Sequence, residues 1–369
     1  MQLYEKILSI EVLAARLEGA FLADPQIGAM WRAQAALSEV CRSVGLEGVP
    51  LSEGDLVSRQ FEARQTELET ARGSWLASEM LKVLVSPVDF FRDPERCVQR
   101  CYRAAPLEEG STVDPAELGA GFCRDLTILV EEAPSPLVAA LRATSHLRLA
   151  TESANPAAER LFFTMIDHSL RSRRAGARDL NFDEDVGSVE VLAALRGDWV
   201  FLPSCALTAE GFRAWQPTVP SGQVSLLDGL QVELSRAMGQ LPLLRRWRAQ
   251  ALASCEGKHG KSRLRDLVHL LMEEPILTTV RVADRLNVSG RTGLNLMNEG
   301  VASGFLAPIT GRRTYRAWAP TPLADYLCQR RPKAQFSEER APLGQEAGSE
   351  AMAALDAALA QADKVLRRT

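Results

Sequence analysis

Four polar side chains of the types that hydrogen-bond DNA bases lie close together in one short stretch of the sequence. Arg291, Asn295 and Asn298 recur at helical spacing, and Thr292 lies beside the first of them. Arginine matches O6 and N7 of guanine, and asparagine matches N6 and N7 of adenine. Ser289 is well placed as the N-cap residue of a helix that carries them. This pattern predicts a helix with one polar side that reads base edges.

The residues around this helix have the pattern of a winged helix-turn-helix over 262–318. Apolar residues at helical spacing predict a first helix that Pro275 ends, and a short strand follows at 276–278. A second helix and a tight turn at 287–289 lead into the helix with the polar side.

The last part of this segment predicts two strands, over 305–309 and 314–318, that pair around a Gly-Arg-Arg turn. Basic residues there and in the preceding linker are suited to phosphates or to the minor groove. These further DNA-binding candidates are Arg312, Arg313 and Arg316 in the hairpin, and Lys258 and Lys261 in the linker.

We expect the side of the helix opposite its polar residues to be buried. Leu294, Met297 and Val301 are assigned to that side because they recur at helical spacing. Gly290 and Gly293 are expected to let the backbone approach closely, at a helix cost of about 1 kcal/mol each. The second helix is assigned the apolar residues Val280, Val282, Ala283 and Leu286.

Charge is distributed unevenly along the 369-residue chain, whose net charge is −4. Residues 243–333 contain 16 Lys and Arg against 7 Asp and Glu, whereas residues 1–242 contain 23 against 34. A basic region that coincides with a helix-turn-helix pattern is the electrostatic footprint of a nucleic-acid-binding module. We therefore expect double-stranded DNA as the partner, with a protein–protein role for the same module as the alternative.

Helical periodicity dominates the sequence ahead of the hairpin, which predicts a mainly α fold. Predicted helices cover most of 1–42, then 74–91, 119–132, 136–148, 156–173, 188–196 and 224–254. Ser52 and Asp55 form a capping-box-like start to a further helix that carries Leu56, Phe61 and Leu68. We divide the chain into a helical domain (1–202), a connector with a long helix (203–257), the DNA-binding domain (258–332) and a flexible linker with a terminal helix (333–369). That last helix packs either on the body of the protein or on a partner chain.

Other chemistry has weaker support in the sequence. Seven irregularly spaced cysteines predict reduced cytoplasmic thiols, and no apolar run is long enough for a membrane span. Cys97 and Cys101 stand one helical turn apart, which leaves a redox or metal pair open. His146 and His168 are predicted to be structural, and the acidic stretch around Asp183 a solvated loop. We expect no cofactor, no metal and no catalytic residue.

Residues 43–48, Ser-Val-Gly-Leu-Glu-Gly, resemble the inhibitory motif of Fic-domain proteins. The resemblance makes Ser43, Glu47 and Gly48 the remnant of a motif whose glutamate reaches an ATP-binding arginine. Fic catalysis uses His-x-Phe-x-Asp/Glu-Gly-Asn-Gly-Arg-x-x-Arg, and the corresponding segment is 149–160.

Most Fic catalytic residues are replaced in this segment. Leu149 stands where the catalytic histidine belongs, Ser153 replaces the magnesium-binding acid, and Pro156 removes a donor from the phosphate turn. Only Asn155 and Arg160 match. The resemblance thus implies a catalytically degenerate Fic-like scaffold, with a Fic-type AMP-transferase as the alternative.

Both ends of the chain are similar to a family of alphaproteobacterial, often plasmid-borne proteins in which a helical domain of unknown function precedes a helix-turn-helix. The likeness is carried by Trp31–Ala33, Leu46–Gly48, Arg263–Leu271, Pro275, Val282–Ala283, Leu286–Val288, Thr310–Arg312 and Arg316–Trp318. It implies a DNA-binding regulator. Our main hypothesis is a sequence-specific transcriptional regulator, cytoplasmic and nucleoid-associated, that acts as a homodimer. A non-enzymatic adaptor for an unknown protein partner is the third hypothesis.

Overall fold

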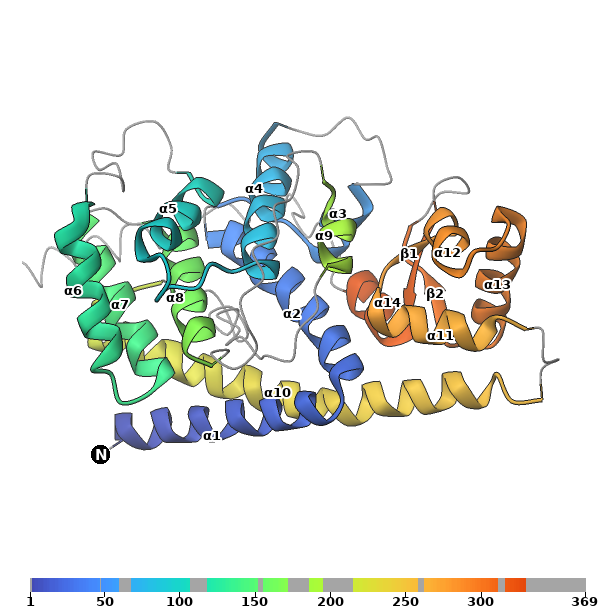
Figure 1. Ribbon diagram of the computed structural model, residues 1–369, viewed down its shortest axis with the longest axis horizontal. Coiled ribbons are helices and arrows are strands. Elements are labelled where there is room, and N and C mark those ends of the chain that lie inside the picture. The colour runs from blue at the N-terminus through green and yellow to red at the C-terminus, as the bar shows by residue number, and fades with distance from the viewer. Residues whose placement is uncertain are drawn as a thin grey trace, which may run out of the picture. The chain divides into compact units, whose positions relative to one another are not determined.

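Helices make up most of the protein, in agreement with the mainly α fold that the sequence predicts (Figure 1). The computed structural model describes residues 2–46, 48–59, 68–106, 118–151, 155–171, 186–194, 215–257, 262–310 and 316–329. Those residues form fourteen helices and one three-stranded sheet, and they all belong to one compact unit. The domain boundaries assigned within this unit stay a prediction.

The first ten described helices form what we call the helical body. They are α1 (Gln2–Ala23), α2 (Pro25–Leu46), α3 (Glu53–Arg59), α4 (Leu68–Val85), α5 (Pro94–Ala104), α6 (Gly119–Glu131), α7 (Pro136–Thr151), α8 (Pro156–Arg171), α9 (Ser188–Ala193) and α10 (Pro220–Ala253). Most lie within a few residues of their predicted ranges. The helix α5 was not predicted, although Asp93 caps it through Arg96 N–H at 2.9 Å and Pro94 begins it.

The helix α8 is buried on all sides, since every residue from Ala157 to Ser169 is buried. It packs against α7, α5, α2 and α4. Four of its buried residues, Glu159, Arg160, Asp167 and His168, carry ionisable side chains. Because an unpaired charge in such an environment is very costly, each of these groups must be either paired or neutral.

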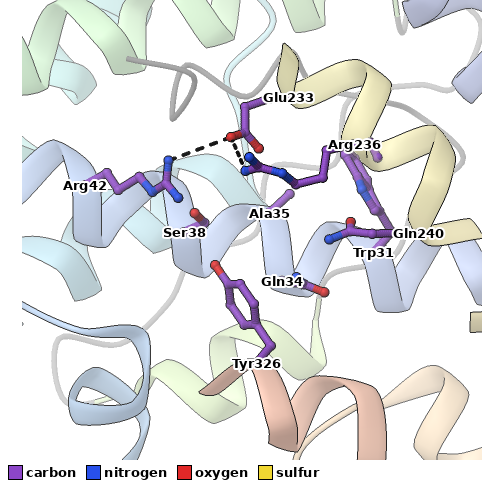
Figure 2. Close-up of a pocket in the computed structure, with 10 residues that line it drawn as sticks. Trp31, Gln34, Ala35, Ser38, Arg42, Glu233, Arg236, Gln240 and Tyr326 are labelled. Carbon is purple, nitrogen blue, oxygen red and sulfur yellow. Dashed lines mark hydrogen bonds and ion pairs between the residues drawn. The ribbon is translucent and has the colours of Figure 1, made fainter. Parts of the chain in front are cut away.

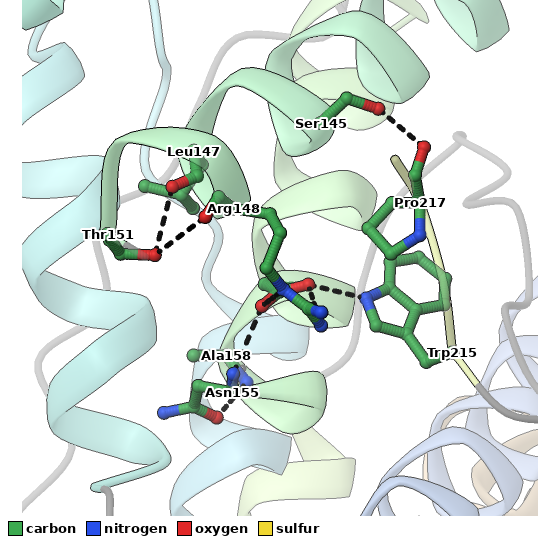
Figure 3. Close-up of polar contacts among 9 residues, drawn as sticks. Ser145, Leu147, Arg148, Thr151, Asn155, Ala158, Trp215 and Pro217 are labelled. Carbon is green, nitrogen blue, oxygen red and sulfur yellow. Dashed lines mark hydrogen bonds and ion pairs between the residues drawn. The ribbon is translucent and has the colours of Figure 1, made fainter. Parts of the chain in front are cut away.

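Glu159 is held by a hydrogen-bond network at the start of α8, whose members Arg148, Asn155 and Trp215 are labelled in Figure 3. Its carboxylate accepts Arg148 Nε at 2.6 Å, Arg148 NH2 at 2.8 Å and Trp215 Nε1 at 2.7 Å. It also accepts the backbone N–H of Asn155 at 3.0 Å, while the side chain of Asn155 caps the helix through Ala158 N–H. The network joins α7, the start of α8 and the residues that lead into α10.

Arg160 and Glu39 form a second buried pair, between α8 and α2. Arg160 Nε and NH2 donate to the same oxygen of Glu39, at 3.2 and 2.9 Å, and both side chains are almost completely inaccessible to solvent. Ser43 donates to that oxygen from one turn further along α2, at 3.3 Å. Asp167 and Glu11 likewise pair with Arg171, at 2.8 and 2.7 Å. These contacts fix α1 and α2 against α8.

The sheet and the remaining helices form what we call the C-terminal module. Its elements are α11 (Leu264–Glu273), β1 (Leu277–Thr278), α12 (Thr279–Leu286), α13 (Gly290–Ala302), β2 (Leu306–Pro308), β3 (Ala317–Pro320) and α14 (Thr321–Gln329). The strand order is β1-β3-β2, both pairs are antiparallel, and Trp318 faces Leu277 on one side and Pro308 on the other. The helix α14, which packs on β2 and β3, was not predicted.

Replacing Glu39 by Ala should destabilise the protein far more than removing an exposed acid. The substitution leaves Arg160 charged and unpaired in the core, a loss of about 3–5 kcal/mol in the free energy of unfolding. The control is Asp266→Ala, whose partner Arg263 is about half exposed, with an expected loss of about 1 kcal/mol or less. Urea unfolding of both variants measures the difference, and equal losses would contradict the buried pairing.

Stability should fall as the pH is lowered from about 6.5 towards 3, in part because of His168. Burial, with a contribution from the Arg32 cation, lowers the pKa of His168 to about 3. The unfolded chain therefore binds a proton that the folded chain does not, which costs up to about 1.4 kcal/mol per pH unit. The variant His168→Gln should lack this component in unfolding curves recorded across the range. The exposed His269→Gln variant should keep it.

Candidate nucleic-acid interface

The helix α13 begins where the sequence predicts, at a serine cap. Ser289 has extended backbone angles, and its hydroxyl accepts the backbone N–H of Thr292 at 3.2 Å. The two hydroxyls of these residues also lie 2.9 Å apart. Just before the cap, Asn287 adopts a left-handed conformation with φ of 50°, which ends α12 and turns the chain sharply. The turn and the cap together set the direction of α13.

The buried side of α13 consists of Leu296, Met297 and two glycines. A Cβ atom at Gly293 would lie 3.2 Å from the carbonyl oxygen of Thr279, so α12 and α13 cross closely at this point. Gly300 has a similar role against the ring of Phe305. The close approach expected of Gly293 is therefore made to α12.

Three apolar residues assigned to the core are instead exposed. Leu294 and Val301 of α13 are each 39% exposed, and Val280 of α12 is 69% exposed. Only Met297 of the predicted apolar side of α13 is buried. The buried side is rotated towards the glycines because a close helix crossing needs small residues there.

The predicted polar residues of α13 all reach the surface. Arg291, Thr292, Asn295 and Asn298 are exposed, at spacings that place them on adjoining turns of one side. Within the described parts of the chain, Arg291 makes no hydrogen bond or ion pair. Its guanidinium and the two side-chain amides are therefore available to an external partner, together with the exposed Leu294.

The arginines of α12 are committed to acidic partners instead. Arg281 binds the buried Glu274 through two hydrogen bonds of 2.7 and 2.9 Å, and this contact raises its pKa. Arg285 pairs with Glu273 at 3.0 Å and with Glu274 at 3.1 Å. The arginines of α12 are thus neutralised by acids, whereas Arg291 of α13 is available to an external partner.

The other predicted DNA contacts are placed only in part. Arg316 is exposed and immediately precedes β3. Arg312, Arg313, Lys258 and Lys261 lie outside the described residues, as does Thr314, the predicted start of the last strand. The described pairing of β2 with β3 has the antiparallel arrangement predicted for the two runs.

Two polar contacts, one buried and one partly buried, join the C-terminal module to the helical body. Trp247 of α10 donates its indole N–H to the carbonyl oxygen of Phe305 at 2.8 Å, and Tyr326 of α14 donates to Glu53 at 2.8 Å. Between α2, α10 and α14 lies a polar cavity of about 40 Å³, where Glu233 pairs with Arg236 at 2.5 Å and faces Arg42 at 4.0 Å (Figure 2). Its volume suits water rather than a larger ligand.

The residues that carry the Fic resemblance have structural contacts. Ser43 is buried and bonds Glu39, while Gly48 has a φ of 80°, and Glu47 lies outside the described residues. Leu149 is exposed near the end of α7. The acid that pairs with Arg160 is Glu39. Glu39 lies one helical turn before Ser43, where the segment that resembles the Fic inhibitory motif begins.

The cysteine pair lies in the core of the helical body. Cys97 and Cys101 are buried, and burial raises the pKa of Cys97 well above its ordinary value. The Cys101 thiol lies 3.2 Å from the sulfur of Met165. Within the described residues there is no cluster of three or more potential metal ligands, and no helix is both long and apolar enough to cross a bilayer.

Comparison with known proteins adds no assignment. No protein-family model matches the chain, and no curated protein matches it at a significant level of similarity. The geometry of the described side chains therefore carries the functional argument.

The crossing of α12 and α13 can be tested with two glycine substitutions in one helix. Gly293→Val places methyl groups against the Thr279 carbonyl and should cost about 1–3 kcal/mol in the free energy of unfolding. Gly290→Val enters open space one turn earlier and should change stability by about 0.5 kcal/mol or less. Thermal and urea unfolding of both variants checks the difference. Equal stabilities would mean that the two helices do not meet at Gly293.

Proposed function

We propose that the C-terminal module is a winged helix-turn-helix that binds double-stranded DNA, and that the protein is a sequence-specific transcriptional regulator. In this assignment α13 is the recognition helix, α12 is the helix before the turn, and the β2–β3 hairpin is the wing. The helical body is assigned no catalysis. A homodimer at the nucleoid completes the proposal.

The order of elements in the module supports a winged helix. Helix, strand, helix, turn, helix and hairpin follow one another from α11 to β3, and β1 closes the sheet against β3. In proteins of this kind the second helix of the helix-turn-helix enters the major groove, with its N-terminal residues at the base edges. Arg291 and Asn295 occupy the first two turns of α13.

The observation that carries the proposal is that polar side chains on the exposed side of α13 have no partner among the described residues. The exposed arginines of α12, Arg281 and Arg285, both pair with Glu274. Arg291 and Asn295 are left to an external partner. A guanidinium and a carboxamide at this spacing match a guanine and an adenine, and the exposed Leu294 beside them suits a thymine methyl group.

The distribution of charge favours DNA over a protein partner. The basic region 243–333 follows an acidic region of 242 residues, so phosphates are attracted to one part of the chain and repelled by the rest. Such a distribution limits non-specific adhesion of the helical body to DNA. A protein–protein module would not need it.

The chemistry of the helical body supports a scaffold rather than an AMP-transferase. At the position that corresponds to the Fic histidine, Leu149 has no group to deprotonate a hydroxyl. Arg160, which corresponds to the last Fic arginine, is fully buried and bonded to Glu39. The side chain of Asn155 accepts a hydrogen bond that caps α8 and donates one to the carbonyl oxygen of Ala105.

Replacing Arg291 by Ala should weaken binding to a specific operator by about fivefold to 150-fold, because a bidentate base contact contributes about 1–3 kcal/mol. The matched control is Arg124→Ala, an exposed arginine on α6 of the helical body, which should leave affinity unchanged. A DNA site selected from a random pool with the full-length protein provides the probe. Fluorescence anisotropy at two or more salt concentrations then measures the affinities.

Two results would count against this assignment. Selection that enriches no sequence would remove the sequence-specific role. Equal affinities of the Arg291 variant and the control would place the DNA-reading surface elsewhere. A steep fall of affinity with salt is expected, because each phosphate contact releases counterions. Footprints with two half-sites about one helical turn apart would support the homodimer.

A further inference from the structure

A cleft in the helical body lies between α1, α6, α7 and α10. Its volume is about 450 Å³, within the range of about 300–1,000 Å³ that small-molecule sites occupy. Aliphatic side chains make up most of its walls, among them Leu3, Ile7, Leu129 and Val138. A cleft of this size and lining suits an aliphatic chain.

Three polar residues of the cleft have contacts within the protein, two of them through hydrogen bonds and one through its ring. Ser145 lies 2.7 Å from the carbonyl oxygen of Pro217, and Gln223 donates to the same oxygen at 2.8 Å. The ring of His146 stacks on Phe122, with centroids 5.2 Å apart and planes within 8°. These contacts hold the wall of the cleft in place and leave its interior apolar.

Arg142 is the one Lys or Arg among the described residues that line the cleft. It lines the cleft from α7, its side chain is exposed, and none of the described residues makes a hydrogen bond or ion pair with it. None of the described residues that line the cleft is acidic. Among the described residues, the cleft therefore combines aliphatic side chains with one arginine that has no acidic neighbour in the lining.

We propose that this cleft binds an amphipathic monocarboxylate, with its hydrocarbon chain among the aliphatic residues and its carboxylate on Arg142. A planar guanidinium binds a carboxylate through two parallel hydrogen bonds, and such charge-assisted bonds strengthen next to apolar surface. A single cation beside an aliphatic interior matches one negative group at the end of one chain. The proposal concerns the helical body and is independent of DNA binding by the module.

The test measures binding of three ligands with the same chain to the full-length protein by isothermal titration calorimetry. Decanoate carries the carboxylate, decanol is its neutral counterpart and decyltrimethylammonium its cationic one, all used below the concentrations at which they form micelles. Decanoate should bind about tenfold more tightly than the other two, the size of a partly exposed charge-assisted contact. Arg142→Gln should abolish this preference and preserve decanol binding.

Two further variants make the result specific to the cleft. Arg124→Gln on α6 removes an exposed arginine that does not line the cleft, and should leave all three affinities unchanged. Val138→Trp fills the half-buried wall and should abolish binding of all three ligands. Circular dichroism melting curves establish that each variant is folded.

Several outcomes would overturn the proposal. They are the absence of decanoate binding to the wild-type protein, equal decanoate affinities of the wild-type protein and Arg142→Gln, and unchanged binding by a folded Val138→Trp variant. If sedimentation shows a dimer that Val138→Trp dissociates, a second copy of the chain occupies the cleft instead. None of these results bears on the affinity of the module for DNA, so the two proposals fail separately.

Discussion

The burial of a charged helix is the constraint on which the helical body depends. The interior side chains of α8 include two acids and an arginine, and none of them reaches water. Each therefore fixes a neighbour: Glu159 requires Arg148 and Trp215, and Arg160 requires Glu39. Removing one partner costs more than the pair contributes, since a lone charge remains in the core. The packing of α2 and α7 against α8 follows from these pairings as well as from apolar burial.

Ion pairing also distinguishes neutralised from unpaired arginines among the described residues of the C-terminal module. Its sequence is rich in arginine, yet Arg281 and Arg285 are neutralised by Glu273 and Glu274. Arg245 and Arg248 at the end of α10 both face Asp24, and Arg263 pairs with Asp266. The charge that the described surface offers to a polyanion is thus smaller than composition indicates. The position of the unpaired Arg291 on α13 is therefore more informative than the total positive charge of the module.

Local signals in the sequence were sufficient for most helices and for the start of α13. Ser289 was identified correctly as a cap, because capping depends on residues three positions apart. The buried side of α13 was assigned wrongly, because the pattern was read from large apolar residues. Leu294 and Val301 are exposed, and Gly293 takes the interior position against Thr279. Glycine has no apolar side chain, so hydrophobic periodicity does not identify a buried glycine as an interior position.

Contacts between distant segments were beyond sequence reasoning. Glu39 and Arg160 are 121 positions apart, and the pattern around Ser43 drew attention to Glu47 instead. The helix α5 was not predicted, although Asp93 and Pro94 form a typical helix start. Physical reasoning from one sequence identifies caps and turns, whose partners are near, but it cannot choose among several acids for one buried arginine.

The long helix α10 contacts both the aliphatic cleft and the C-terminal module. Its first turns line the aliphatic cleft through Gln223 and Leu227, and its last turns carry Trp247. The indole N–H of Trp247 has its acceptor in Phe305, the residue that packs under Gly300 of α13. Separating α10 from the module would leave a buried donor unsatisfied, at a cost of about 1–3 kcal/mol. The direction of α13 is therefore tied to α10, so its exposed side is held by the body rather than by a flexible tether.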